Sequence, residues 1–180
     1  MKEIEVKILE IDKTAVQNRL AALGAEEHFA GEMHALFFDD AQGSITRRGE
    51  VLRLRKEGNE VVMAFKSPLE IGAAKIMEEL EITVSDLQTT RHILEKLGFT
   101  AEKETRKHRT EYLLAGAKVV IDEYFDQLAC IPPFIEIEAP DLENLYHVVQ
   151  LLGYSPADCT DWNTYDLMVH YAPAEKPERP

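Results

Sequence analysis

Paired carboxylates recur three times along this chain, each time as two glutamates separated by one residue. The pairs are Glu3-Ile4-Glu5, Glu79-Leu80-Glu81 and Glu136-Ile137-Glu138. Side chains of a β-strand alternate between its two faces, so both carboxylates of a pair point one way and the middle residue points the other. Carboxylate oxygens bind hard divalent cations such as Mg²⁺ or Mn²⁺ and can serve as general bases. The spacing predicts acidic side chains aimed at one place.

Basic residues show the same alternation in other strand-like runs. Arg53 and Arg55 share one face of a strand, Lys107 and Arg109 share one face of another, and Lys66 ends a run of strand-forming residues. Guanidinium groups match phosphate oxygens bidentately, and lysines supply point charges. We therefore expect the ligand to be a linear chain of phosphates with bound metal.

A half-buried antiparallel sheet with one wet face would also alternate charged and aliphatic residues. Such a face usually mixes Thr, Ser, Gln, Asn and Lys, whereas here position after position holds an arginine or a carboxylate. We therefore expect the charged face to line a tunnel inside a small barrel, which can hold one ligand. Its lining would be six basic and eight acidic residues, namely Lys7, Arg53, Arg55, Lys66, Lys107 and Arg109 with Glu3, Glu5, Glu79, Glu81, Glu111, Asp122, Glu136 and Glu138.

Hydrophobic spacing predicts the elements that position these residues. Amphipathic helices are expected over Asp12–Gly24, Asp86–Gly98 and Asp141–Gly153, because apolar residues recur at spacings of three, four and seven and a glycine follows the last of them. With about eight strand-like runs, the pattern predicts an α+β fold: an eight-stranded antiparallel β-barrel (tunnel) with helices packed on its outside.

Length and composition fit one domain, which we expect to span residues 1–171 of the 180. The proline-rich tail 172–180 is expected to be disordered. No signal-peptide or transmembrane pattern is present, and two cysteines give no disulfide or zinc pattern, so we expect a cytoplasmic protein. A net charge of −13 argues against nucleic-acid and membrane partners. A homodimer is left open.

The sequence also carries a family resemblance. Glu3-Ile4-Glu5-Val6-Lys7 resembles the ExExK signature of the CYTH superfamily, or triphosphate tunnel metalloenzymes, which includes class IV adenylyl cyclases, thiamine triphosphatases and inorganic triphosphatases. The resemblance spans most of the chain, and the sequence looks most similar to the class IV adenylyl cyclase-like branch. One departure is Met77, which occupies a position where that branch often has arginine. It continues in order through Leu52–Arg55, Phe65-Lys66, Glu78–Glu81, Lys107-x-Arg109-x-x-Tyr112, Val120–Asp122 and Ile135–Glu138.

The resemblance implies a role for each site residue. Mg²⁺ or Mn²⁺, in two sites, would be held by Glu3, Glu5, Asp122, Glu136 and Glu138. The triphosphate substrate would be bound with the help of Lys7, Arg53, Arg55, Lys66, Glu79, Glu81, Lys107 and Arg109. We assign catalysis to Glu136, Glu138, Lys66 and Arg55.

Two reactions fit such a site. In a triphosphatase acting on tripolyphosphate, thiamine triphosphate or a nucleoside triphosphate, water attacks the terminal phosphorus with Glu136 or Glu138 assisting. In a class IV adenylyl cyclase, the ribose 3′-hydroxyl of ATP attacks the α-phosphorus, giving 3′,5′-cyclic AMP and pyrophosphate. A non-catalytic polyphosphate-binding module is the third possibility, but loss of catalysis usually removes carboxylates and every expected acid is present. We rank hydrolysis first, because it needs only a bound phosphate chain and a water molecule.

Overall fold

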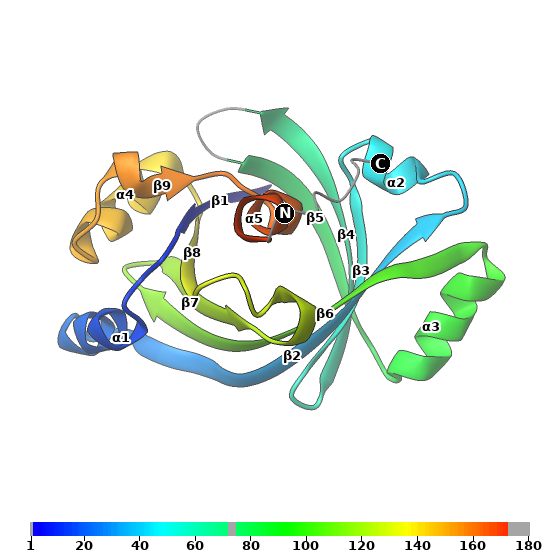
Figure 1. The fold of residues 1–180 in the computed structure, drawn as a ribbon. Coiled ribbons are helices and arrows are strands. Elements are labelled where there is room, and N and C mark those ends of the chain that lie inside the picture. The colour runs from blue at the N-terminus through cyan, green and yellow to red at the C-terminus, as the bar shows by residue number, and fades with distance from the viewer. Residues whose placement is uncertain (1, 72–74, 173–180) are drawn as a thin grey trace.

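Antiparallel strands form a closed ring around a charged interior (Figure 1). The computed structural model describes residues 2–71 and 75–172, with side chains for residues 4–69 and 77–172. The strands are β1 (Lys2–Ile8), β2 (Glu26–Asp40), β3 (Val51–Glu57), β4 (Glu60–Ile71), β5 (Lys75–Val84), β6 (Phe99–Leu114), β7 (Ala117–Tyr124), β8 (Phe134–Ala139) and β9 (Cys159–Thr160). They pair in the order β5-β4-β3-β2-β6-β7-β8-β1-β9, and an additional pairing of β1 with β5 closes the ring.

The predicted α+β tunnel fold is confirmed, with one difference in strand number. Eight strands make the closed ring, and the ninth, β9, is a two-residue strand that pairs with Lys7 and Ile8 of β1. Two residues are too few to show a period-two pattern in the sequence, so β9 could not be predicted. Except for Ala172, the tail that we expect to be disordered lies outside the described residues.

The three predicted helices are confirmed as α1 (Lys13–Ala22), α3 (Leu87–Lys96) and α4 (Leu142–Leu151). An aspartate caps each one, and its carboxylate accepts a hydrogen bond from the backbone N–H three residues later. A glycine with positive φ follows each helix and permits the left-handed turn back toward the sheet. Two further helices, α2 (Ser44–Arg47) and α5 (Thr164–Tyr171), and the short 3-10 segments Asp126–Leu128 and Pro156–Asp158 complete the elements. None of the described helices is long and apolar enough to cross a membrane.

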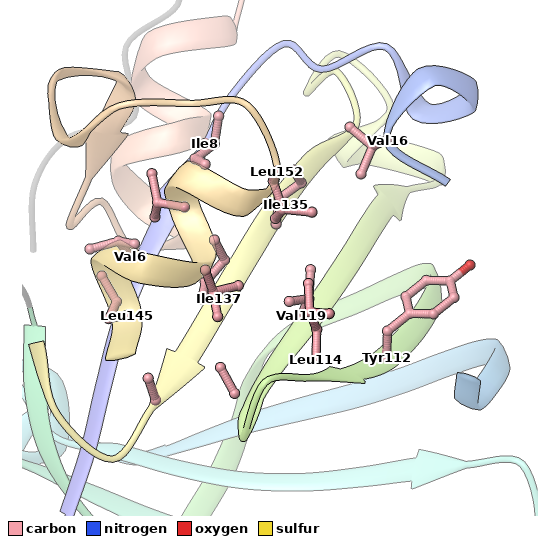
Figure 2. Packing of buried hydrophobic residues seen from close by; sticks show 14 of the residues in the cluster. Val6, Ile8, Val16, Tyr112, Leu114, Val119, Ile135, Ile137, Leu145 and Leu152 are labelled. Carbon is pink, nitrogen blue, oxygen red and sulfur yellow. The ribbon is translucent and has the colours of Figure 1, made fainter. Parts of the chain in front are cut away.

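Helices α1, α3 and α4 pack on the outer face of the ring. Figure 2 shows Leu145 of α4 near Val6 of β1 and Ile137 of β8, and Leu152, just after α4, beside Ile135 of β8. All belong to the largest hydrophobic cluster of the described residues. On another part of the ring, Leu94 of α3 belongs to a cluster with the aliphatic residues of β3. Burying a side chain of this kind stabilises the fold by about 1.5–3 kcal/mol. Because aliphatic residues face outward, the charged residues that alternate with them must face inward.

The helices that we expect on the outside of the barrel do not cover the outer face of β5. Leu80 and Ile82 are 62% and 55% exposed. Both lie on the outer face, opposite to Glu79 and Glu81. The helices contact other strands of the ring, which leaves this strip of β5 exposed (Figure 1).

Candidate functional site

Three carboxylates meet inside the ring where β1 lies beside β8. Glu5 is the cross-strand partner of Glu138, and Glu136 lies two residues earlier on the same face of β8. One oxygen from each of the three lies within 4.8 Å of the other two. Like charges at this spacing repel one another unless cations lie close to them. The cluster therefore requires a counter-charge.

Lys7 of β1 supplies part of that counter-charge. Its buried Nζ lies 2.9 Å from Glu136 Oε2 and 3.4 Å from Glu5 Oε1. Burial acts to lower the pKa of Lys7, but the charges of Glu136 and Glu5 outweigh burial and raise this pKa. Burial likewise acts to raise the pKa of Glu136, but Lys7, Arg109 and Lys107 outweigh it and hold this pKa well below its usual range. At neutral pH the pair is therefore fully ionised.

A second buried ion pair is centred on Asp122 of β7, which is 0% exposed. Arg109 of β6 donates hydrogen bonds from Nε to Oδ1 at 2.8 Å and from Nη2 to Oδ2 at 2.7 Å, and Lys107 Nζ lies 2.5 Å from Oδ2. Such bidentate pairing fixes the guanidinium plane. Asp122 therefore holds Arg109 in a position where its Nη2 lies 3.7 Å from Glu136 Oε1.

Burial and charge act in opposite directions on these groups. Burial acts to raise the pKa of Asp122, but Arg109 and Lys107 outweigh it and lower this pKa. For Lys107 the balance is different, since burial and the neighbouring charge of Arg109 lower its pKa to about 8 despite Asp122. The two cations share one carboxylate, so the group carries an excess of positive charge.

Strands β3, β4 and β5 contribute another set of ion pairs. Arg53 Nη2 lies 3.4 Å from Glu79 Oε1, and Lys66 Nζ lies 3.2 Å from Glu79 Oε2. Arg55 Nη2 lies 3.2 Å from Glu81 Oε2. The Nε atoms of Arg53 and Arg55 are buried and have no hydrogen-bond partner within the described part of the chain. A buried donor without an acceptor is costly, and phosphate oxygens are acceptors that a guanidinium group binds well.

The two groups of charges share one interior. Burial and the charge of Arg55 lower the pKa of Arg53, and the charge of Arg109 on β6 contributes to the same effect. Arg53 and Arg109 come from strands that are separated by β2 in the ring. Both arginines lie on the inner face, so the carboxylates near β1 and the arginines of β3 face one common interior.

Each predicted site residue with a described side chain alternates with outward-facing residues and lies on the inner face. These residues are Glu5, Lys7, Arg53, Arg55, Lys66, Glu79, Glu81, Lys107, Arg109, Asp122, Glu136 and Glu138. Glu3 belongs to β1, but its side chain lies outside the described residues. The structure gathers Glu5, Glu136 and Glu138 into one cluster, whereas both oxygens of Asp122 are engaged by Arg109 and Lys107. The functional roles of all these residues stay predictions.

The charged residues of the interior that were not singled out from the sequence include Lys118 and Glu57. Lys118 of β7 is ion-paired with Glu138, and Glu57 of β3 lies 3.4 Å from Arg55 Nε. Lys118 is in phase with Asp122, and Glu57 is in phase with Arg55. Period-two spacing could therefore have identified both residues, but their partners depend on which strands are neighbours.

The carboxylate cluster suits a hard divalent cation. Its donor set is three carboxylates, without the imidazole or thiolate ligands that favour softer metals. Glu5, Glu136 and Glu138 would hold the ion, and Lys7 would stay beside it as a structural cation. Mg²⁺ or Mn²⁺ is the metal that this chemistry favours.

A closed antiparallel ring with an ionic interior and helices outside defines the class of protein. A sequence model described as the CYTH domain matches residues 1–158. The chain belongs to the CYTH family.

A relative and two solved structures are similar to this chain. A protein of Methanocaldococcus jannaschii, provisionally named an adenylate cyclase, is 28% identical over 138 residues, which are 77% of each chain. A Vibrio parahaemolyticus structure, also provisionally named an adenylate cyclase, has a TM-score of 0.77 at 20% identity and covers 92% of this chain and 97% of its own. A Hippeastrum protein, provisionally an adenylyl cyclase with a dominant triphosphatase activity, has a TM-score of 0.61 at 20% identity, covering 84% and 87%. At these identities the two structures bear on the fold alone.

The low pKa of Asp122 ties folding stability to pH. The pKa of this carboxyl is lower in the folded protein than in the unfolded chain, where the pKa of an aspartate is about 3.9. Its stabilising contribution is therefore complete above that pH and is lost as pH falls through the folded-state pKa. At neutral pH we expect Asp122→Asn to be less stable than the wild type by about 3–5 kcal/mol, because Arg109 and Lys107 lose their buried counter-charge. Below about pH 4 the difference in the free energy of unfolding between the wild type and Asp122→Asn should become smaller.

Urea unfolding of both proteins, from neutral pH to about pH 3, measures this difference in unfolding free energy. Glu143→Gln, which changes an exposed carboxylate of α4, is the control and should follow the wild type. A gap that is the same at every pH would show that the charge of Asp122 is not what stabilises the fold.

Divalent metal should stabilise the folded chain, because a ligand that binds only the native state shifts the unfolding equilibrium. We expect the melting temperature to rise with millimolar Mn²⁺ or Mg²⁺ and to return on chelation. Glu5→Gln should lose most of this rise. Glu123→Gln is the matched control, since Glu123 lies on the same sheet but pairs with Lys13 at 2.8 Å, away from the cluster. An equal metal-dependent rise in both variants would place the ion elsewhere.

Proposed function

We propose that this chain is a metal-dependent triphosphatase that hydrolyses inorganic or organic triphosphates inside the ring. One juxtaposition carries the proposal. Three carboxylates within 4.8 Å of one another share an interior with the buried Nε atoms of Arg53 and Arg55, neither of which has a hydrogen-bond partner in the described part of the chain. The carboxylates suit a metal, and the donors suit the oxygens of a phosphate chain that the metal would also contact.

Glu5, Glu136 and Glu138 would hold the metal. When bound, it supplies Lewis-acid polarisation of a phosphoryl oxygen. Arg53 and Arg55 would then donate to the phosphate chain, and Lys66 would add a point charge. As negative charge develops on the leaving diphosphate, these fixed cations stabilise it without having to reorient.

One of the two carboxylates of β8 is poorly suited to act as a base. A general base works best when its pKa lies near the operating pH. The pKa of Glu136 is held well below its usual range by Lys7 and Arg109, so Glu136 stays a permanent anion and suits metal binding. Glu138 is therefore our choice for orienting the attacking water, with Lys118 beside it.

Cyclisation of ATP is the second candidate. The provisional names of the Methanocaldococcus jannaschii and Vibrio parahaemolyticus proteins favour it, whereas the activity of the Hippeastrum protein favours hydrolysis. The same metal and arginines would serve both reactions. We rank hydrolysis first because it requires only a bound phosphate chain and a water molecule.

Product analysis separates the two reactions. With Mg²⁺ or Mn²⁺, we expect tripolyphosphate to be converted to orthophosphate and pyrophosphate at least as fast as ATP is hydrolysed, since tripolyphosphate contains everything the arginines recognise. Thiamine triphosphate in a parallel reaction tests an organic substrate. Phosphorus NMR of the reaction mixtures identifies the products. If cyclic AMP were the main product from ATP and tripolyphosphate were left intact, the activity would be cyclisation and not hydrolysis.

A matched pair of arginine variants tests the site in the same assay. Arg55→Met should lower kcat/KM on the order of 10²-fold, because it removes a donor to the developing charge. Arg106→Met removes an exposed arginine from β6 and should act like the wild type. Equal rates from both variants would mean that the phosphate chain binds elsewhere.

A further inference from the structure

Lys118 of β7 forms an ion pair with one member of the carboxylate cluster. It is the direct cross-strand partner of Glu138 on β8, and its Nζ contacts Glu138 Oε2. Among the described residues, no other carboxylate lies within 4.0 Å of this ammonium group. Lys118 follows Ala117, the first residue of β7, and its side chain is 36% exposed, whereas that of Glu138 is 12% exposed. The contact therefore reaches into the cluster from the end of the ring at which β6 turns into β7.

Lys7, the other lysine of the cluster, is bound differently. Its Nζ contacts both Glu136 and Glu5, at 2.9 and 3.4 Å, and its side chain is only 6% exposed. Two carboxylates on two strands therefore fix Lys7, whereas Lys118 contacts Glu138 alone. The two cations divide the cluster into a pair of carboxylates that Lys7 bridges and a third carboxylate that Lys118 contacts.

A contact through one oxygen can determine what the Glu138 carboxylate does. The terminal torsion of a glutamate side chain has broad minima, so its carboxylate turns easily. An ammonium group on Oε2 resists this rotation, and the carboxylate keeps further acceptor capacity for a water molecule. Carboxylates bind divalent cations with one oxygen or with two. Without the lysine, both oxygens of Glu138 could turn toward an ion that Glu5 and Glu136 also bind.

We propose that Lys118 is a positioning residue, which holds Glu138 in place for the attacking water and limits the share of Glu138 in metal binding. The inference rests on the proposed function, in which Glu138 orients that water. Lys118 acts through Glu138 and does not itself touch the substrate. Loss of Lys118 should therefore have two opposite effects, tighter metal binding and slower turnover.

The test compares Lys118→Met and Lys118→Arg with a matched control, Lys13→Met. Lys13 contacts Glu123 on the outer face of the same strand, and its side chain is 32% exposed, close to the 36% of Lys118. Titration with Mn²⁺, followed by the EPR signal of the free ion, gives a dissociation constant without any substrate. Steady-state kinetics with tripolyphosphate at saturating Mn²⁺ gives kcat and KM.

Lys118→Met should bind Mn²⁺ more tightly than the wild type, on the order of 10-fold, because a positive charge beside the ion is removed. Its kcat should fall on the order of 10-fold, because the group that orients the water is no longer held in place. KM should change little, since the arginines that bind the phosphate chain are intact. Lys118→Arg should restore both values, because a guanidinium group also donates to a carboxylate. Lys13→Met should match the wild type.

The direction of the change in Mn²⁺ affinity guards against a purely structural explanation. A variant that folds poorly, or a lysine that only supports the cluster, would give weaker Mn²⁺ binding together with slower turnover. That result would overturn the proposal, and so would Mn²⁺ binding equal to that of Lys13→Met. A higher KM with unchanged kcat would assign Lys118 to substrate binding and would also overturn it.

The Mn²⁺ titration separates this proposal from the proposed function. Wild-type protein that binds Mn²⁺ without hydrolysing tripolyphosphate would contradict the triphosphatase. The Mn²⁺ affinities of Lys118→Met and Lys13→Met would still decide whether Lys118 limits the share of Glu138 in metal binding. If the wild type hydrolyses tripolyphosphate and Lys118→Met keeps the wild-type kcat, the triphosphatase stands and the positioning role alone is overturned.

Discussion

Burial of opposite charges inside a closed sheet is the constraint on which this structure depends. Asp122 is fully buried, and Glu5, Lys7 and Arg109 are nearly so. An unpaired charge at such depth costs several kcal/mol, and a pair regains that cost only with good geometry. The interior is therefore organised as linked ion pairs across neighbouring strands. An arrangement of this kind adds little to stability, so its presence indicates that the charges have another use.

The outer layer makes the ionic interior possible. Aliphatic residues of β1, β3, β7 and β8 that alternate with the charged ones are buried beneath α1, α3 and α4, and this burial supplies the favourable free energy that the interior does not. The pairing of β1 with both β5 and β8 closes the ring and brings the first strand beside the last long one. That closure places Glu5 next to Glu138, although 133 positions separate them in the chain.

Local patterns in the sequence were sufficient to predict most of the fold. The period-two alternation placed the Glu-x-Glu pairs and the arginines of β3 on one face, and the spacing of apolar residues with a following glycine predicted α1, α3 and α4. Pairings between distant strands could not be predicted this way. The contacts of Asp122 with both Arg109 and Lys107 could not be predicted either, because they depend on side-chain positions in the assembled ring.

A charged interior that binds a metal–phosphate complex can be observed directly. Crystals grown with Mn²⁺ and tripolyphosphate, with data collected near the manganese absorption edge, would locate the metal by its anomalous signal. The account predicts a manganese peak between Glu5, Glu136 and Glu138, with phosphate oxygens within hydrogen-bonding distance of Arg53 Nε and Arg55 Nε. A peak away from these carboxylates, or a phosphate chain bound outside the ring, would contradict it.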